Sequence, residues 1–142
     1  VLEAGRIAPT AKNMQPWKVY VVEKEKDLAL LRSLTPCAFD APVVLMFCGI
    51  EAESAHSGFD GHSWDQMDTT IVMTHMMLEA QAQGLGTCIV GWFDSEAVQK
   101  AFQLPEGEHL WCLLPMGYPA ADAKPGPQHH RRKEMSQLVT RL

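Results

Sequence analysis

The chain has 142 residues, of which 46% are hydrophobic, and this predicts a single globular domain over residues 1–142. Seventeen acidic residues against twelve basic ones give a formal net charge of −5, which argues against nucleic acid or an anionic membrane as a partner. The longest apolar run, residues 42–48, is too short to cross a bilayer. We therefore expect a cytoplasmic protein that binds neither nucleic acid nor membranes.

The first eight residues have the pattern of the end of a helix, and the chain starts without a methionine. We expect that the start of this first helix is missing from the sequence.

Residues 8–17 form a polar stretch between two prolines and run directly into an apolar segment. A proline disfavours the helical region for the residue before it, so we expect a stiff loop with Gln15 in extended geometry. Thr10, Asn13 and Gln15 supply hydroxyl and amide groups suited to a planar ligand with donors and acceptors along its edge. The same residue types are common in surface turns, and composition alone does not decide between the two.

The next three elements follow from their apolar patterns. Residues 17–22 are rich in β-branched and aromatic side chains and predict a strand. Residues 25–34 place leucines at helical spacing and end before a proline, which predicts a short amphipathic helix. Residues 43–49 contain no polar alternation, so we expect a central strand that is buried on both faces.

Residues 51–63 are small, polar and glycine-containing, and we interpret them as a mobile loop or lid. Residues 63–66 match a capping box, which predicts the start of a long helix that continues to Gly84. This helix is apolar around most of its circumference, so we expect it to be central. Its four methionines indicate core packing rather than a metal site, because no His or Cys is spaced with them as in a metal cluster.

The glycine-rich stretch 84–94 invites comparison with a dinucleotide-binding fingerprint. A helix precedes its glycines where a strand should, and its third glycine is misplaced, so we reject that interpretation. We expect Gly84 to end the helix in a left-handed conformation and Gly91 to allow close approach of the backbone to a ligand. A plain turn between helix and strand is the alternative.

The last third of the chain begins with a short helix capped by Asp94 or Ser95 and continues into an apolar strand from residue 109. Residues 120–128 are rich in Pro, Gly and Ala and predict an extended arm. The basic cluster 129–133 follows, and it could bind a phosphate monoester or simply be solvated. The four cysteines are widely spaced and mostly in apolar segments, which indicates reduced thiols rather than a disulfide framework.

Taken together, these motifs resemble those of the FMN-dependent nitroreductase family. They occur in the family's order and span nearly the whole chain, which makes coincidence improbable. The matching segments are Pro-Thr-x-x-Asn-x-Gln-Pro-Trp at 9–17, Gly-Leu-Gly-Thr-Cys at 84–88, Gly-Tyr-Pro at 117–119 and the basic cluster.

The resemblance implies an α+β fold with a mixed central sheet flanked by helices, and a homodimer with two FMN sites at the subunit interface. In this family the absent start of the first helix also contributes to the flavin site. The resemblance places Pro9, Thr10, Asn13 and Gln15 at the flavin ring edge, backbone N–H groups of Val90, Gly91 and Trp92 near flavin N5, and Arg131, Arg132 and Lys133 at the phosphate. Phe59 and Trp64 are our candidates for stacking on a flat acceptor.

No side-chain triad, carboxylate pair or zinc motif is present, and the family does not need one, because the cofactor carries the chemistry. The resemblance implies FMN, NADH or NADPH as hydride donor, and a small-molecule acceptor such as a nitroaromatic or quinone. One alternative is a relative with a different flavin reaction, such as dehalogenation, which the short segment 51–63 supports little. The other alternative is a flavin-binding subunit without turnover.

Overall fold

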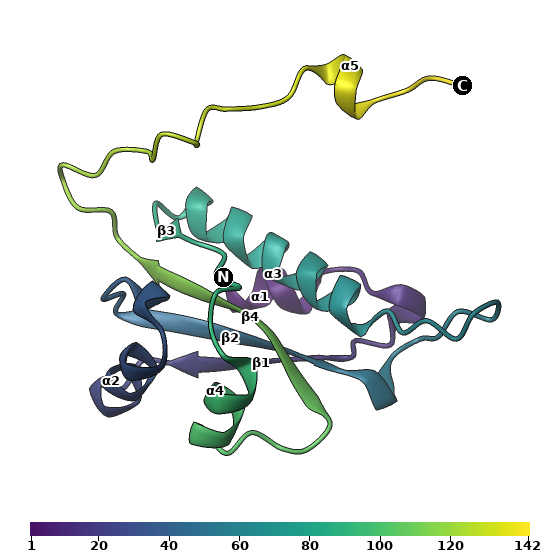
Figure 1. The fold of residues 1–142 in the computed structure, drawn as a ribbon, viewed down its shortest axis with the longest axis horizontal. Helices are drawn as coiled ribbons and strands as arrows, with labels where there is room; N and C mark the ends of the chain where they lie inside the picture. Colours follow the sequence, from purple (N-terminus) through teal and green to yellow (C-terminus); the bar gives the residue numbers. More distant parts are fainter.

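The computed structural model describes residues 1–142 and has an α+β fold, with helices on both faces of a four-stranded sheet (Figure 1). The strands are β1 (Trp17–Val22), β2 (Val43–Ile50), β3 (Gly86–Thr87) and β4 (Glu108–Gly117), in the order β1-β2-β4-β3. The helices are α1 (Leu2–Arg6), α2 (Glu25–Leu34), α3 (Asp65–Ala82), α4 (Ser95–Ala101) and α5 (Met135–Leu138), with short 3₁₀ turns η1 (Ala11–Asn13), η2 (Pro36–Ala38) and η3 (Glu51–Glu53).

All three strand pairings are antiparallel, so the expectation of a mixed sheet is wrong for these residues. The reason lies in the position of β4. Helix α3 connects β2 to β3, and these two strands run in the same direction, as expected for a helical crossover. Because β4 is inserted between them, every strand has only antiparallel neighbours.

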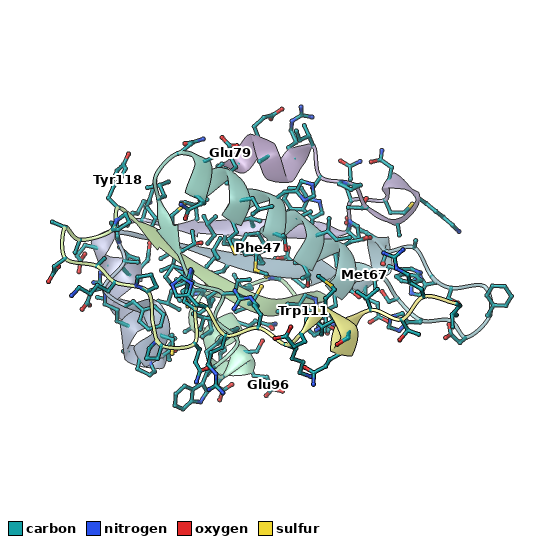
Figure 2. The ribbon with its side chains drawn as sticks, turned by 90° about the horizontal axis from the view of Figure 1, so that it is seen from above. Phe47, Met67, Glu79, Glu96, Trp111 and Tyr118 are labelled. Carbon is teal, nitrogen blue, oxygen red and sulfur yellow. The ribbon has the colours of Figure 1, made fainter.

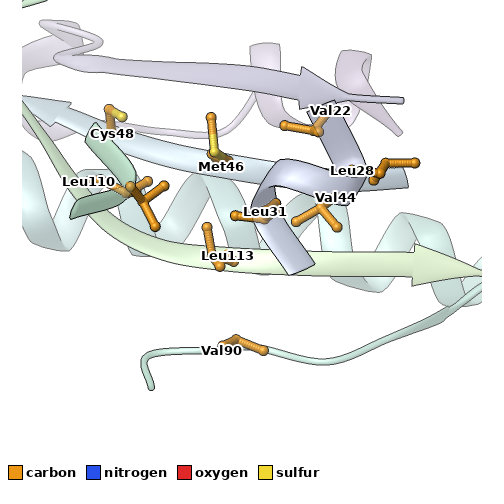
Figure 3. Close-up of a cluster of buried hydrophobic side chains, with 10 residues drawn as sticks. Val22, Leu28, Leu31, Val44, Met46, Cys48, Val90, Leu110 and Leu113 are labelled. Carbon is orange, nitrogen blue, oxygen red and sulfur yellow. The ribbon is translucent and has the colours of Figure 1, made fainter. Parts of the chain in front are cut away.

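Strand β2 separates two hydrophobic cores, and its central residues are buried on both faces, as its sequence predicts. On one face, Phe47 packs with residues of α3 such as Val72 and Met76. On the other face, Met46 packs with Leu31 of α2 and with other residues drawn in Figure 3. Helices α1 and α3 therefore cover one face of the sheet, and α2 and α4 cover the other.

Helix α3 differs from its prediction at its start and on its outer side. The capping box does not form: Trp64 is the N-cap, and the Ser63 hydroxyl instead donates to the Asp65 carboxylate (2.7 Å). The helix buries one side only, and the exposed apolar residues Met67 and Leu78 lie on the other, so the helix is not central. Its end agrees with the prediction, because Gly84 has a φ of +80°.

Two segments project from this body (Figure 1). Residues 54–63 form a hairpin closed by a bridge between His56 and Ser63. At the other end of the molecule, where Figure 2 labels Tyr118, the chain leaves β4 as an exposed arm, residues 118–142. Residues 120–142 make no hydrogen bond to the rest of the chain. No helix in the structure has the length and apolarity that crossing a membrane requires.

Candidate functional site

The polar loop 8–16 connects α1 to β1 and is attached to the start of α3. Ala8 is buried in the core beneath α3, and the N–H of Ala11 donates to Oδ1 of Asp68 (2.9 Å). Asp68 is only 2% exposed, and its second oxygen has no hydrogen-bond partner. A buried carboxylate on the first turns of a helix is favoured by the positive end of the helix dipole. Asp68 thus fixes the middle of the loop to α3.

Within the loop, the backbone is held by its own polar side chains. The N–H of Gln15 donates to the Thr10 hydroxyl (3.0 Å), and the Gln15 amide donates to the carbonyl of Asn13 (3.2 Å). Lys12, Asn13 and Gln15 have φ values of 52°, 56° and 54°. Gln15 is therefore left-handed rather than extended, and the expectation of extended geometry is wrong, because the bond to Thr10 holds this residue in a tight turn.

The positive φ of these three non-glycine residues costs about 1–3 kcal/mol of conformational free energy for each residue. Such conformations cluster at ligand sites. The side-chain amide of Asn13 has no partner in the structure, and Pro9, Asn13 and Gln15 are all exposed. The loop therefore presents unsatisfied amide and carbonyl groups to solvent in a fixed backbone.

The segment after β3 continues along the edge of β4, where Figure 3 shows Val90 beside Leu113. Val90 and Leu113 exchange two backbone hydrogen bonds, Val90 N–H to Leu113 O (2.9 Å) and Leu113 N–H to Val90 O (3.0 Å). The assignment of Val90 as an N–H donor to flavin is therefore corrected: its N–H is already bonded to β4 inside the core.

Gly91 differs from Val90 because its N–H is free. The carbonyl of Val90 and the N–H of Gly91 belong to one planar trans peptide, in which the two groups point in opposite directions. Since Leu113 holds that carbonyl toward β4, the Gly91 N–H points away from the sheet. A Cβ placed on Gly91 would meet no atom within 4 Å. Trp92, 80% exposed, also has a free N–H, and its carbonyl accepts from the Thr35 hydroxyl (3.1 Å).

Loop 8–16 and the segment 90–92 lie at opposite edges of the sheet. The loop is bonded to α3 and leads into the edge strand β1, whereas Val90 pairs with β4 on the side of β3. One chain alone therefore does not bring these two sets of predicted residues together. A cleft of about 760 Å³ lies at the base of the arm, and Cys88 is one of its lining residues. No residue of loop 8–16 or of the segment 90–92 lines it.

The remaining predicted residues are also apart from these two sets. Arg131, Arg132 and Lys133 are exposed on the arm, where Arg131 donates to Gln128 (3.2 Å) and Arg132 to a backbone carbonyl (2.7 Å). Phe59 is fully exposed in the hairpin. Trp64 directly precedes α3, at the same end of that helix as Asp68, and packs edge-on against His62.

The largest pKa shifts fall on groups in the strands of the sheet. Burial raises the pKa of the Cys48 thiol to about 12 and that of Cys112 to about 11. Burial and the hydrogen bond to Glu108 raise the pKa of Tyr20. These groups lie in strands of the sheet, so the geometry offers backbone donors and side-chain amides rather than a proton-transfer residue.

Sequence reasoning missed two residues that hold the candidate segments, Asp68 and Thr35. Asp68 carries a weak signal, because it is an acidic residue inside an apolar helix. Thr35 precedes a proline at the end of α2 and resembles an ordinary turn residue, and nothing local to it indicates a contact with Trp92.

The model of the nitroreductase family matches residues 1–42 and 30–118 of this sequence. The chain belongs to the nitroreductase family. It is 29% identical to an NADH dehydrogenase from Thermus thermophilus, over 88% of this chain and 77% of that protein.

Solved structures agree with this membership. A nitroreductase family protein from Clostridium difficile 630 has a TM-score of 0.90 and 31% identity, covering 98% of this chain and 81% of that one. A structure described as an oxidoreductase containing FMN has a TM-score of 0.70 and 20% identity, covering 82% of this chain and 63% of that one. At that identity the second likeness concerns the fold alone.

Proposed function

We propose that this chain is the subunit of an FMN-dependent oxidoreductase that uses NADH or NADPH and reduces a small flat acceptor such as a nitroaromatic or quinone. When bound, FMN supplies the redox chemistry, accepting hydride at N5 and passing electrons to the acceptor. The observation that carries the proposal is the Gly91 N–H, which is unpartnered, points away from the sheet and has open space beside it. Its neighbour Val90 fixes its direction before any ligand arrives.

The residues present fit the polar parts of the cofactor. Thr10, Asn13 and Gln15 would bind the ring edge, and the N–H groups of Gly91 and Trp92 would face N5. Donors placed where negative charge develops favour the reduced, electron-rich flavin, without any proton transfer by the protein. The Arg132 and Lys133 side chains, with Arg131, would hold the phosphate as charge-assisted hydrogen-bond donors.

These groups meet if two copies of the chain share each site, as a homodimer. Loop 8–16 of one subunit would then face segment 90–92 of the other, although the two lie at opposite edges of the sheet within one chain. Support for this assembly comes from the exposed apolar residues Met67 and Leu78 of α3, and Met135 and Leu138 of the arm. Large apolar side chains gathered on two separate elements are typical of an interaction surface.

Phe59 and Trp64 lie at the same end of α3 as loop 8–16 and would form an aromatic wall for the acceptor. The hairpin that carries Phe59 has only ten residues, 54–63, and the exposure of Phe59 makes it a contact element rather than a closed lid. This favours a flat acceptor that enters from solvent.

The test is the visible spectrum of the purified protein with added FMN, before and after anaerobic NADH or NADPH. We expect flavin absorbance that remains with the protein on gel filtration and bleaches on addition of either nucleotide. Retained flavin that stays oxidised would instead select the non-catalytic flavin-binding subunit. A protein that does not retain FMN would contradict the proposal.

A further inference from the structure

We propose that Thr35 is a positioning residue for the flavin donor segment, which we define as residues 90–93. This inference rests on the proposed function, because it concerns how the protein holds the N–H group of Trp92 beside that of Gly91. Thr35 lies between α2 and η2 and is 2% exposed. It does not itself contact the proposed flavin.

The Thr35 side chain uses both of its hydrogen-bonding functions. Its hydroxyl donates to the carbonyl of Trp92 (3.1 Å) and accepts from the N–H of Cys37 (3.1 Å). The second bond fixes the hydroxyl in the turn after α2, so the first bond ties the donor segment to a rigid corner. No other hydrogen bond reaches the Trp92 carbonyl.

Three consecutive peptide units explain what this bond controls. The unit between Val90 and Gly91 is fixed to β4 through Leu113, and the unit between Trp92 and Phe93 is fixed through Thr35. The unit between them carries the Gly91 carbonyl and the Trp92 N–H, neither of which has a partner. Its orientation is therefore set by the two fixed units that flank it.

Glycine makes the downstream attachment necessary. Gly91 has access to far more backbone conformations than other residues, so the attachment to β4 alone does not determine where Trp92 points. Without the Thr35 bond, the chain is free to rotate between Val90 and Asp94, whose side chain caps α4. Thr35 thus restricts the Trp92 N–H to one direction before the flavin binds.

Preorganised donors lower the free energy of the charged state most, because no reorganisation is needed when charge develops. If the donor segment loses its downstream attachment, the affinity for reduced FMN should therefore fall, and the affinity for oxidised FMN should fall less. A hydrogen bond of ordinary strength corresponds to about a three- to tenfold change in an equilibrium constant. We expect a change of this size in the ratio of the two affinities.

The test compares Thr35→Val with Thr69→Val. Both residues are buried threonines, but the Thr69 hydroxyl has no hydrogen-bond partner and lies in α3, on the other face of the sheet. Thr69→Val is therefore a matched control that removes a buried hydroxyl without breaking a bond. Thr35→Ser keeps both bonds and should restore wild-type behaviour. Thr35→Cys keeps only a weak donor and provides an intermediate variant if Thr35→Val does not fold.

Two measurements are made on each variant. In the protein without flavin, the NMR order parameter of the Trp92 amide should fall in Thr35→Val from about 0.85, typical of rigid backbone, toward about 0.6, while that of the Gly91 amide, which Leu113 holds, should stay near 0.85. With flavin, the ratio of the dissociation constants for oxidised and reduced FMN should fall by about three- to tenfold in Thr35→Val. Thr69→Val and Thr35→Ser should match the wild type in both.

The outcomes separate this inference from the proposed function. If the wild type binds FMN and is reduced by NAD(P)H, but Thr35→Val behaves like Thr69→Val in both measurements, then only the role of Thr35 is wrong. If Thr35→Val loses stability while both readouts stay unchanged, Thr35 is structural and the inference is again overturned. If the wild type does not bind FMN, the proposed function fails, and this inference fails with it.

Discussion

At the scale of single residues, the four cysteines divide by burial. Cys48 and Cys112 lie inside the sheet's cores, Cys37 is half-buried, and Cys88 is exposed. Burial disfavours the thiolate, which is why the pKa of Cys48 rises to about 12 and that of Cys112 to about 11. The expectation of reduced thiols is confirmed, but Cys88 is not a core residue.

We therefore predict that stability falls at alkaline pH. An acid with a raised pKa in the folded state contributes stability that is intact below its unfolded pKa of 9.0 and is lost as pH rises toward the folded values near 11 and 12. Urea unfolding between pH 8 and 11 should show a decreasing free energy of unfolding. The double variant Cys48→Ala, Cys112→Ala should lose the part of this slope that comes from the thiols. If the double variant keeps the pH dependence of the wild type, the two thiols do not contribute to it and the prediction is wrong.

At the scale of elements, the helix α3 and the polar loop act together. The Ala11 N–H has one partner, Asp68, which is 57 positions away in the sequence. The loop's unusual backbone, with positive φ at Lys12, Asn13 and Gln15, is thus supported by a carboxylate on a helix that also fills the core. Substitutions on α3 should therefore affect the Asn13 and Gln15 amides even where the substituted residue does not contact them.

Replacing Asp68 tests this link. Asp68→Ala removes the acceptor of the Ala11 N–H and should weaken FMN binding by about tenfold, the size expected for one hydrogen bond near a charged group. Asp68→Asn keeps an acceptor oxygen and should bind FMN more tightly than Asp68→Ala. Fluorescence titration with FMN measures both. Equal weakening by the two substitutions would show that the charge, rather than the hydrogen bond, supports the loop.

At the scale of the whole molecule, the arm is the feature that one chain does not explain. Residues 120–142 carry exposed apolar and basic side chains and make no hydrogen bond to the body, whose sheet and two cores are complete without them. An arm of this kind is suited to exchange between subunits, which is a common route to symmetric dimers.

Deleting residues 120–142 should therefore leave the body folded and impair assembly. We expect near-native circular dichroism, a monomer in sedimentation velocity, and loss of FMN retention, because the proposed phosphate cations are removed with the arm. The triple substitution of Arg131, Arg132 and Lys133 by Ala is the companion experiment. It should weaken FMN binding while the protein stays dimeric. A truncated protein that is still dimeric and flavin-bound would contradict the proposed role of the arm.

The sequence predicts features that depend on near neighbours and fails where distant segments meet. The bounds of α2, the left-handed Gly84 and the Asp94 cap follow from residues a few positions apart. The loss of the Val90 N–H to Leu113 depends on a pairing that no local pattern encodes. The prediction that α3 is central failed for a different reason. Apolar content indicates that a helix surface becomes covered, but it does not indicate whether the same chain or another one covers it.

Strand β4 also has a mechanical consequence. Leu113, which is hydrogen-bonded to Val90, lies four residues before Gly117, where the strand ends and the arm begins. Because β4 is hydrogen-bonded along both edges, a pull on the arm is shared with β2 and β3 through the pairs at residues 113–117. The pair between Leu113 and Val90 is therefore shielded from tension where a partner would hold the arm, and the carbonyl of Val90 keeps its direction.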